Sequence, residues 1–166
     1  MIRGALGKLV DVDDDDDDDG KTAARLQGRL GQISLLRASG GSRKDNAELD
    51  VAARTFCSGA SLCENAIGII EGVALRHPLQ KQVRAASQRS LKASFHSFLA
   101  ATHDARGDVD EAVGERRRQL AAAERSGDDV LVAAAHLGLG RALLLQDQDQ
   151  DQDQDRRREG DAMSPS

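Results

Sequence analysis

The four histidines are the side chains of this chain best suited to metal or acid-base chemistry: His77, His96, His103 and His136. His96 and His103 are separated by seven positions, or two helical turns, whereas two ligands of one ion on a helix normally stand three or four positions apart. The spacing therefore predicts histidines that pack or line a groove, and it predicts no metal site.

Two further motifs resemble the beginnings of ligand-binding loops. Gly20-Lys21-Thr22 ends like a phosphate-binding P-loop, but Asp15 stands where the motif requires its first glycine, and consecutive aspartates would repel a triphosphate. The spacing from Asp15 to Gly20 also resembles the start of an EF-hand, yet Leu26 occupies the position of its bidentate glutamate. We therefore expect neither a nucleotide nor a specific cation, and no cofactor.

The chain lacks the motif of a nucleophilic enzyme. Cys57 and Cys63 are its only cysteines, and at six positions apart on a helix they point to different faces, so they predict reduced, buried thiols and no local disulfide. No Gly-x-Ser-x-Gly elbow surrounds a serine. These observations predict a protein that is not an enzyme.

Two arginine triplets, 116–118 and 156–158, are the candidate nucleic-acid contacts. Three consecutive helical residues fan over about 200°, so the first triplet cannot form one flat basic face. Only three residues of the chain are aromatic, all Phe, which gives little means of stacking bases. The triplets therefore indicate a solvated helix face and no specific nucleic-acid partner.

The charge is distributed unevenly along the 166 residues. The segment before Gly20 has a net charge of -6, the body from Gly20 to Gln146 has +5, and the remainder has -4. The Asp run and the alternating Gln-Asp tract cannot bury apolar surface, so residues 1–20 and 147–166 are predicted to be disordered acidic ends. Residues 21–146 form the predicted folded domain.

Apolar periodicity within the body predicts five helices and no strand, which is an all-α fold. The first is expected over 21–38 with Leu26, Leu30, Ile33 and Arg37 on one stripe, and Pro78 and Gly107 separate the later helices. Asp108 is expected to cap the fourth helix, and Asp128 or Asp129 the fifth. The predicted inward residues of the other helices are Leu49, Ala52, Phe56, Ala60, Cys63, Ile67 and Ile70; Leu91, Phe95, Phe98, Leu99 and Thr102; Val109, Ala112, Val113, Leu120 and Ala123; and Val132, Ala135, Leu139, Ala142 and Leu143.

A weak repeat relates the first, third and fifth helices. Leu30-Gly31, Leu99-Ala100 and Leu139-Gly140 lie midway along them, and a small residue there would let two helix backbones approach closely. Together with Gly107-Asp-Val109, which opens the fourth helix, this pattern resembles the tetratricopeptide repeat (TPR). The resemblance implies antiparallel helix pairs stacked as a short right-handed solenoid of about two and a half repeats.

The resemblance also implies a binding groove. In TPR arrays the first helix of each pair lines a concave surface that holds a partner peptide. Placed residue by residue on this chain, the groove candidates are Arg25, Arg29, Gln32, Ser94, Ser97, Asp104 and Arg141. An arginine-lined groove would suit an acidic peptide. The chain's own Asp run is an alternative occupant, which would make that run autoinhibitory.

Within the TPR proteins, the run from Gly107 to Gly140 is most similar to the tonsoku-like DNA repair family. That likeness implies a non-enzymatic adaptor in replication-coupled repair, and the small number of repeats suggests a fragment of a longer repeat protein. Two alternatives remain open. One is a regulatory or signalling TPR domain that binds an acidic peptide, and the other is a largely disordered acidic protein that folds on binding.

The remaining expectations concern location and self-association. The start of the chain has no apolar stretch of signal-peptide length, and no run of about 18 apolar residues occurs, which predicts a soluble, intracellular protein of the nucleus or cytoplasm without a membrane partner. The predicted fifth helix has no partner helix after it, and Leu143, Leu144 and Leu145 lead directly into the Gln-Asp tract. Self-association through this open face is therefore expected.

Overall fold

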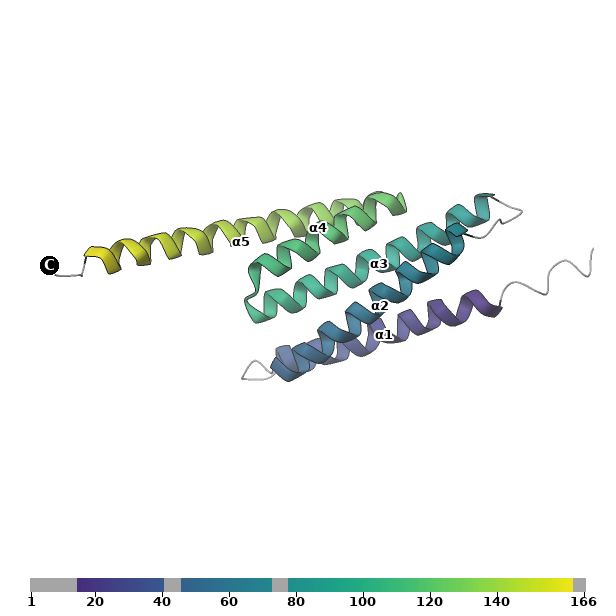
Figure 1. Ribbon diagram of the computed structural model, residues 1–166, viewed down its shortest axis with the longest axis horizontal. Helices are drawn as coiled ribbons and strands as arrows, with labels where there is room; N and C mark the ends of the chain where they lie inside the picture. Colours follow the sequence, from purple (N-terminus) through teal and green to yellow (C-terminus); the bar gives the residue numbers. More distant parts are fainter. Residues whose placement is uncertain (1–14, 41–45, 73–77, 163–166) are drawn as a thin grey trace, which may run out of the picture.

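The computed structural model describes residues 15–40, 46–72 and 78–162, and it is all-α, as predicted (Figure 1). Within these residues five helices follow one another and no strand occurs. Their bounds are α1 Asp15–Gly40, α2 Asn46–Gly72, α3 Pro78–Arg106, α4 Val109–Ser126 and α5 Asp129–Ala162. Consecutive helices run in opposite directions, and α1 and α5 form the two edges (Figure 1).

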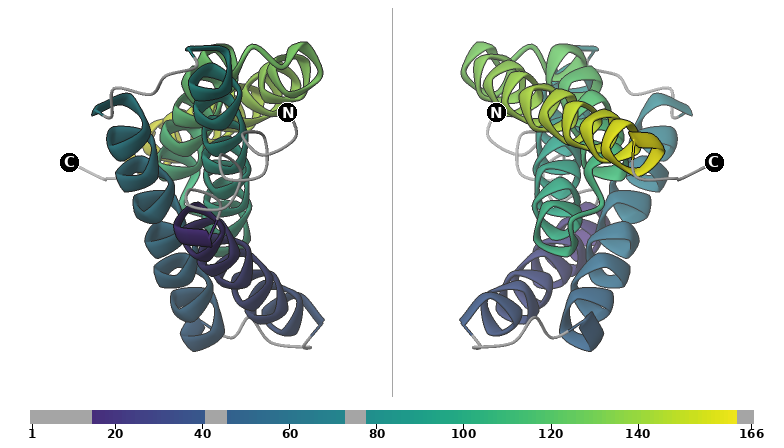
Figure 2. Two further views of the ribbon diagram at one scale, coloured as in Figure 1. Left: turned by 90° about the vertical axis from the view of Figure 1, so that its right-hand side faces the viewer. Right: turned by 90° about the vertical axis from the view of Figure 1, so that its left-hand side faces the viewer.

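The helices pack in chain order, each against the next, with lighter contacts between α1 and α3 and between α3 and α5. Views from the two ends show that the helices cross at an angle and splay apart (Figure 2). Because α3 contacts all four of the other described helices, it is the central element of the fold.

All three phenylalanines of the chain lie in the core that joins α1, α2 and α3. The ring of Phe56 stacks on Phe98 with centroids 5.1 Å apart, and it meets Phe95 at 6.5 Å in a tilted arrangement. Glycines make room for these rings. A Cβ built on Gly31 would lie 2.5 Å from Phe56 Cε1, and one built on Gly59 would lie 2.3 Å from Phe95 Cε1.

Alanines form the core that joins α3, α4 and α5. Ala93, Ala122, Ala123 and Ala135 are buried together, with the larger Leu120, Leu131 and Val132 only partly buried around them. The small side chains allow the helices to approach closely but bury little apolar surface per residue. The two halves of the molecule therefore have cores of different composition.

The predicted inward faces of α2 and α3 are confirmed. Every predicted inward residue of α2, from Leu49 to Ile70, is buried. In α3 the predicted Phe95, Leu99 and Thr102 are buried, and Leu91 and Phe98 are half-buried. In α4 and α5 the prediction is confirmed for half of the residues: Ala112, Val113, Ala123, Ala135 and Ala142 are buried, whereas Val109, Leu120, Val132, Leu139 and Leu143 are only half-buried.

The predicted inward face of α1 is wrong. Leu26, Leu30 and Ile33 are exposed, and Arg37 lies on the same outer side. The helix instead buries Ala24, Gly31, Ser34 and Ala38. The physical reason is the Phe56 ring of α2, which leaves space for a hydrogen atom at Gly31 and for no larger side chain.

The close helix contacts predicted at three small residues require those residues to be buried. This condition is met at Gly31 and Ala100 but not at Gly140. Gly31 and Ala100 are buried, whereas Gly140 is exposed and a Cβ built on it would meet nothing within 4 Å. No described helix follows α5, so no backbone or side chain covers this position. In α5 it is Gly138 that faces a neighbour, since its added Cβ would lie 3.2 Å from Arg116 Nη1.

The ends of α3, α4 and α5 follow from local chemistry. Gly107 and Gly127 adopt φ values of 88° and 73°, which glycine reaches without steric cost, and they end α3 and α4. Asp128 caps α5, because its Oδ1 accepts bonds from the backbone N–H of Val130 at 3.1 Å and of Leu131 at 3.0 Å. Asp108 occupies the N-cap position of α4 as predicted, but its side chain makes no capping bond.

The predicted disorder of the acidic ends is not confirmed within the described residues. Helix α1 begins at Asp15, inside the Asp run, and α5 continues through the Gln-Asp tract to Ala162. Negative charge is favourable in the first turn of a helix, and a helix already formed extends readily through Gln, a good helix former. Residues 1–14 and 163–166 lie outside the described part of the chain.

One segment of α5, Asp129–Gln148, is long and apolar enough to cross a membrane, judged by length and composition alone. A single helix of this kind is weak evidence for a membrane span, although only 11% of this segment is buried, unlike the core helix of a soluble protein that passes the same test. The finding is compatible with the soluble protein predicted above.

Candidate functional site

A groove between α1 and α3 brings together four of the seven predicted peptide-groove residues. Arg25, Arg29 and Gln32 of α1 and Ser94 of α3 line one cavity of about 280 Å³. Both arginines are exposed, while Gln32 and Ser94 are half-buried. The same cavity is lined on its apolar side by Gly28, Leu91, Phe95 and Phe98.

A second cavity of about 290 Å³ continues this groove toward α5. It shares Arg25, Leu91 and Ser94 with the first cavity, and it adds Lys21 of α1 and Asp128 and Leu131 near the start of α5. We call the two cavities together the α1–α3 groove. Among the lining residues whose side chains are described, the charged rim is mainly basic, with Lys21, Arg25 and Arg29 and one carboxylate, Asp128.

The groove also contains a buried amide that the sequence analysis did not single out. Gln88 of α3 is 6% exposed and lines the second cavity. Its Oε1 is buried and has no hydrogen-bond partner among the described residues. Because an unsatisfied buried polar atom costs about 1–3 kcal/mol, a ligand that donates a hydrogen bond here would bind favourably.

Small residues and phenylalanines position the groove. A Cβ built on Gly28 would lie 3.4 Å from Phe95 Cε1, so α1 lies directly against this ring. Phe95 is buried, and Phe98 is held by its stacking on Phe56. The apolar wall is therefore well packed, while the arginines of α1 extend from the rim into solvent.

The other three predicted groove residues lie elsewhere. Ser97 Oγ accepts a hydrogen bond from Arg116 Nη1 at 3.2 Å, and Asp104 Oδ2 lies 3.6 Å from Arg116 Nη2. Both residues therefore serve the contact between α3 and α4. Arg141 is exposed on α5 and lines neither cavity of the α1–α3 groove.

A larger groove of about 570 Å³ lies on the opposite side of α3, between α2 and α4. The sequence analysis did not predict it. Ion pairs cross from α2 to α3 along it, joining Arg89 with Glu71 and Lys92 with Glu64. The hydrogen bond from Lys92 holds the pKa of the Glu64 carboxyl below its usual value. Because carboxylates neutralise most cations here, this groove has a weaker claim to an acidic ligand than the α1–α3 groove.

His96 and Glu115 form the buried polar contact beside this larger groove. His96 Nδ1 lies 2.7 Å from Glu115 Oε2, and both side chains are buried. Burial opposes ionisation of Glu115, but the hydrogen bond with His96 and the nearby charges of His96 and Arg118 outweigh it and lower its pKa. His96 thus packs and lines a groove, as the histidine spacing predicted.

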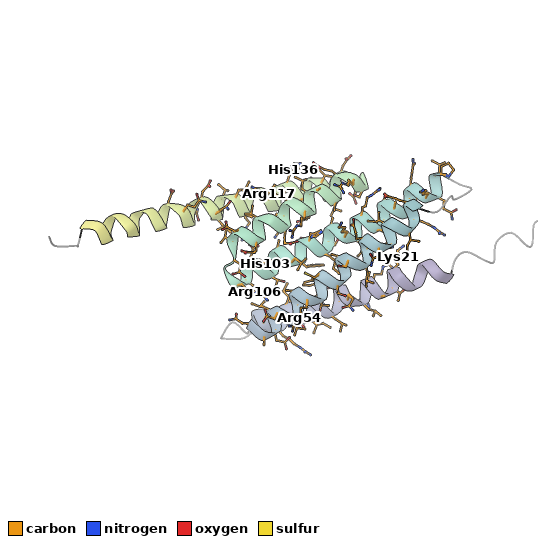
Figure 3. All side chains as sticks on the ribbon, in the orientation of Figure 1. Lys21, Arg54, His103, Arg106, Arg117 and His136 are labelled. Atoms are coloured by element: carbon orange, nitrogen blue, oxygen red, sulfur yellow. The ribbon has the colours of Figure 1, made fainter. Side chains whose placement is uncertain are left out.

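The first arginine triplet points in several directions, as helix geometry requires. Arg116 reaches Ser97 and Gln119, Arg118 pairs with Glu115, and Arg117 is exposed. Figure 3 shows Arg117 and His136 in the α4–α5 half, while Lys21 and Arg54 belong to the α1–α2 half. No continuous basic face therefore arises from the triplet.

Both cysteines are free, but only one of them is buried. Cys63 is fully buried, and burial raises the pKa of its thiol to about 11. Cys57 is exposed, so the prediction that both thiols are buried is wrong for this residue. Its pKa is also raised, first by partial desolvation and then by the charge of Glu115, which leaves neither thiol activated as a nucleophile.

Among the described residues no group of three or more His, Cys, Asp or Glu side chains could hold a metal ion. The described lining of the α1–α3 groove consists of arginines, a lysine, amide and hydroxyl groups and apolar side chains, with the single carboxylate of Asp128. Comparison with protein-family models, with curated proteins and with solved structures finds no match for this chain.

Proposed function

We propose that this protein is a non-enzymatic interaction scaffold of TPR type, and that its α1–α3 groove binds an acidic peptide. The observation that carries the proposal is the meeting of Arg25, Arg29, Gln32 and Ser94 in one cavity. The order of five helices, each packed against the next, supports a short stack of helix pairs.

The groove offers three kinds of contact to an extended peptide. Arg25 and Arg29 would form charge-assisted hydrogen bonds with acidic side chains. Phe95 and Phe98 would contact an apolar side chain between them. Gln88 Oε1, which has no partner among the described residues, would accept a backbone N–H. This combination selects acidic peptides that contain an apolar residue.

Fluorescence anisotropy with a labelled Asp/Glu-rich decapeptide containing one leucine tests the proposal. The double variant Arg25→Glu/Arg29→Glu is expected to bind more than tenfold more weakly, because each lost charge-assisted bond is worth about 1.5–3 kcal/mol. The matched control is Arg54→Glu/Arg117→Glu, which makes the same charge change at exposed residues that do not line the groove. Equal affinities of the two variants would refute binding in this groove.

Gln88→Leu gives a second test in which stability and binding change in opposite directions. Removing the unpartnered Oε1 is expected to increase the free energy of unfolding by about 1 kcal/mol. The same change removes the hydrogen-bond acceptor offered to the peptide and so weakens its binding. If the variant binds the peptide as tightly as the wild type, the amide has no part in recognition.

The wider role implied by the tonsoku-like resemblance, an adaptor in replication-coupled DNA repair, is tested by pull-down with the full chain. Recovery of replication-fork or histone-chaperone proteins by the wild type, and not by Arg25→Glu/Arg29→Glu, would support it. Recovery of signalling proteins instead would favour the regulatory alternative. Low helix content and no cooperative melt by circular dichroism would favour a disordered protein that folds on binding.

A further inference from the structure

The two edge helices of the molecule both expose apolar stripes. On α1, Leu26, Leu30 and Ile33 are 55%, 57% and 45% exposed. They lie on the opposite side of the helix from Gly31, which packs against Phe56. This stripe is therefore separate from the contact that holds α1 in the fold.

Helix α5 exposes a longer stripe at the other edge. Val130, Leu137 and Leu144 follow one another at intervals of seven residues, and they are 80%, 77% and 65% exposed. Ala133 and Gly140 lie between them and are also exposed. Large residues that alternate with small ones form a surface of knobs and gaps that suits a second helix.

The internal repeat shows that the stripe on α1 occupies packing positions. When Gly31 is aligned with Ala100, Leu26 and Leu30 correspond to Phe95 and Leu99 of α3. Those two residues of α3 are buried in the core shared with α2. The α1 stripe thus corresponds to the face of α3 that is covered by a neighbouring helix.

The same repeat shows which face of α3 corresponds to the stripe on α5. When Gly140 is aligned with Ala100, Ala133 corresponds to Ala93. Ala93 and Ala100 are completely buried in α3, and Ala93 packs with alanines of α4. Both edges therefore present faces that a neighbouring helix covers elsewhere in the same fold.

The spacing of the two stripes is complementary when the helices run parallel. Leu26 and Ile33 are seven residues apart, as are Leu137 and Leu144, so Leu26 can lie beside Leu137 while Ile33 lies beside Leu144. In this register Leu30 falls at the level of Arg141, one position beyond Gly140, where no side chain occupies the space. The two pairs would lie about 10 Å apart along the helices.

Charge favours the same orientation. From Lys21 to Gly40, α1 has four basic residues and no acidic one, and Arg37 continues its apolar stripe. Beyond Leu145, α5 exposes Asp147 and Asp151, which would lie beside Arg37 in the parallel register. The antiparallel register would bring these aspartates toward the Asp run at the start of α1, and the parallel register brings Asp128 and Asp129 toward the same run, so repulsion between aspartates does not separate the two orientations. The attraction between Arg37 and the two aspartates, which only the parallel register provides, is what favours it.

We propose that the outer face of α5 docks against the outer face of α1 of a second copy of this chain, with the two helices parallel. The contact is heterologous, because it joins two different surfaces. Each added copy leaves one α1 face and one α5 face open, so association continues beyond a dimer. This contact uses the outer stripe of α1, which adjoins Arg25 and Arg29 of the α1–α3 groove but does not line that groove.

Sedimentation velocity of the full chain tests the proposal with Leu30→Asp and Leu137→Asp. The wild type is expected to grow with concentration beyond twice its 17.7 kDa mass. Each variant alone remains monomeric, because one of its two docking faces is disrupted. An equimolar mixture restores a dimer, but no larger species, because one intact α1 face meets one intact α5 face.

The control is Ile69→Asp, which places the same charge at a residue of α2 that is 66% exposed and lies on neither edge. It is expected to associate like the wild type, and circular dichroism verifies that all variants keep their helix content. A wild type that is monomeric at all concentrations would overturn the proposal. So would a Leu30→Asp variant that still dimerises, which would indicate symmetric α5 pairing.

A membrane is the other surface that α5 could contact, and flotation with phosphatidylcholine/phosphatidylserine vesicles distinguishes it. Binding of a monomeric wild type to vesicles, abolished by Leu137→Asp and unchanged by Leu30→Asp, would replace the head-to-tail contact with a lipid contact. We expect no flotation, because the other side of α5 buries Ala135 and Ala142. Insertion across a bilayer would have to separate those residues from the fold.

Discussion

The same glycine-to-alanine substitution at two positions of α2 separates the packing of Phe95 from helix propensity. At Gly59 the new Cβ would lie 2.3 Å from two atoms of the buried Phe95 ring, whereas at Gly68 it would meet nothing within 4 Å. Alanine in a helix interior is favoured over glycine by about 0.8–1 kcal/mol at either site. Only Gly59→Ala adds the cost of overpacking, about 1–3 kcal/mol.

The expected results follow from these two contributions. Gly68→Ala raises the free energy of unfolding by up to about 1 kcal/mol. Gly59→Ala leaves it unchanged or lowers it by up to about 2 kcal/mol, because overpacking opposes the gain in propensity. The difference between the variants is then about 1–3 kcal/mol and measures the steric conflict alone.

Urea unfolding followed by circular dichroism at 222 nm measures both variants. Adding Phe95→Leu to each variant completes the design, because a smaller side chain should remove the conflict at Gly59 and should not change the effect at Gly68. Equal stabilisation by both glycine substitutions would show that α2 and α3 do not approach as closely as described, and the account of the phenylalanine core would fail.

Two further predictions concern titratable groups. The pKa of Glu115 is lowered from 4.5 in the folded protein, so its contribution to stability is present above that pH and is lost as the pH falls through the folded value. Unfolding free energies measured from pH 7 to pH 3 should therefore fall less steeply for Glu115→Gln than for the wild type, and parallel curves would contradict this. Cys57 should react with a maleimide under native conditions while Cys63, which is buried with a pKa of about 11, reacts only after unfolding, as mass spectrometry of labelled peptides can show. Equal labelling of both thiols in the folded protein would argue against the burial of Cys63.

Periodicity predicted most of the fold because large apolar residues mark the inner faces of α2 and α3. It failed for α1, where Leu26 and Leu30 form the more apolar stripe but face solvent. The deciding feature is the shape of the partner helix, since the Phe56 ring requires Gly31 opposite it. A single sequence cannot show which ring meets which glycine before the helices are placed.

The candidate site could be predicted only in part. Arg25, Arg29, Gln32 and Ser94 repeat on helices that lie side by side, so alignment of the repeats was enough to group them. Gln88 was missed because its significance lies in a missing hydrogen-bond partner, which no residue pattern encodes.

Because α1–α3 share a phenylalanine core and α3–α5 share an alanine core, we expect the two halves of the molecule to differ in local stability. Alanine seams bury little apolar area, so separating α5 from α4 exposes less surface to water than separating α2 from α3. Amide hydrogens of α5 should consequently exchange with solvent through partial openings, while those of α2 should exchange only when the whole protein unfolds. We therefore expect α5 to open locally while the core of α1–α3 stays folded.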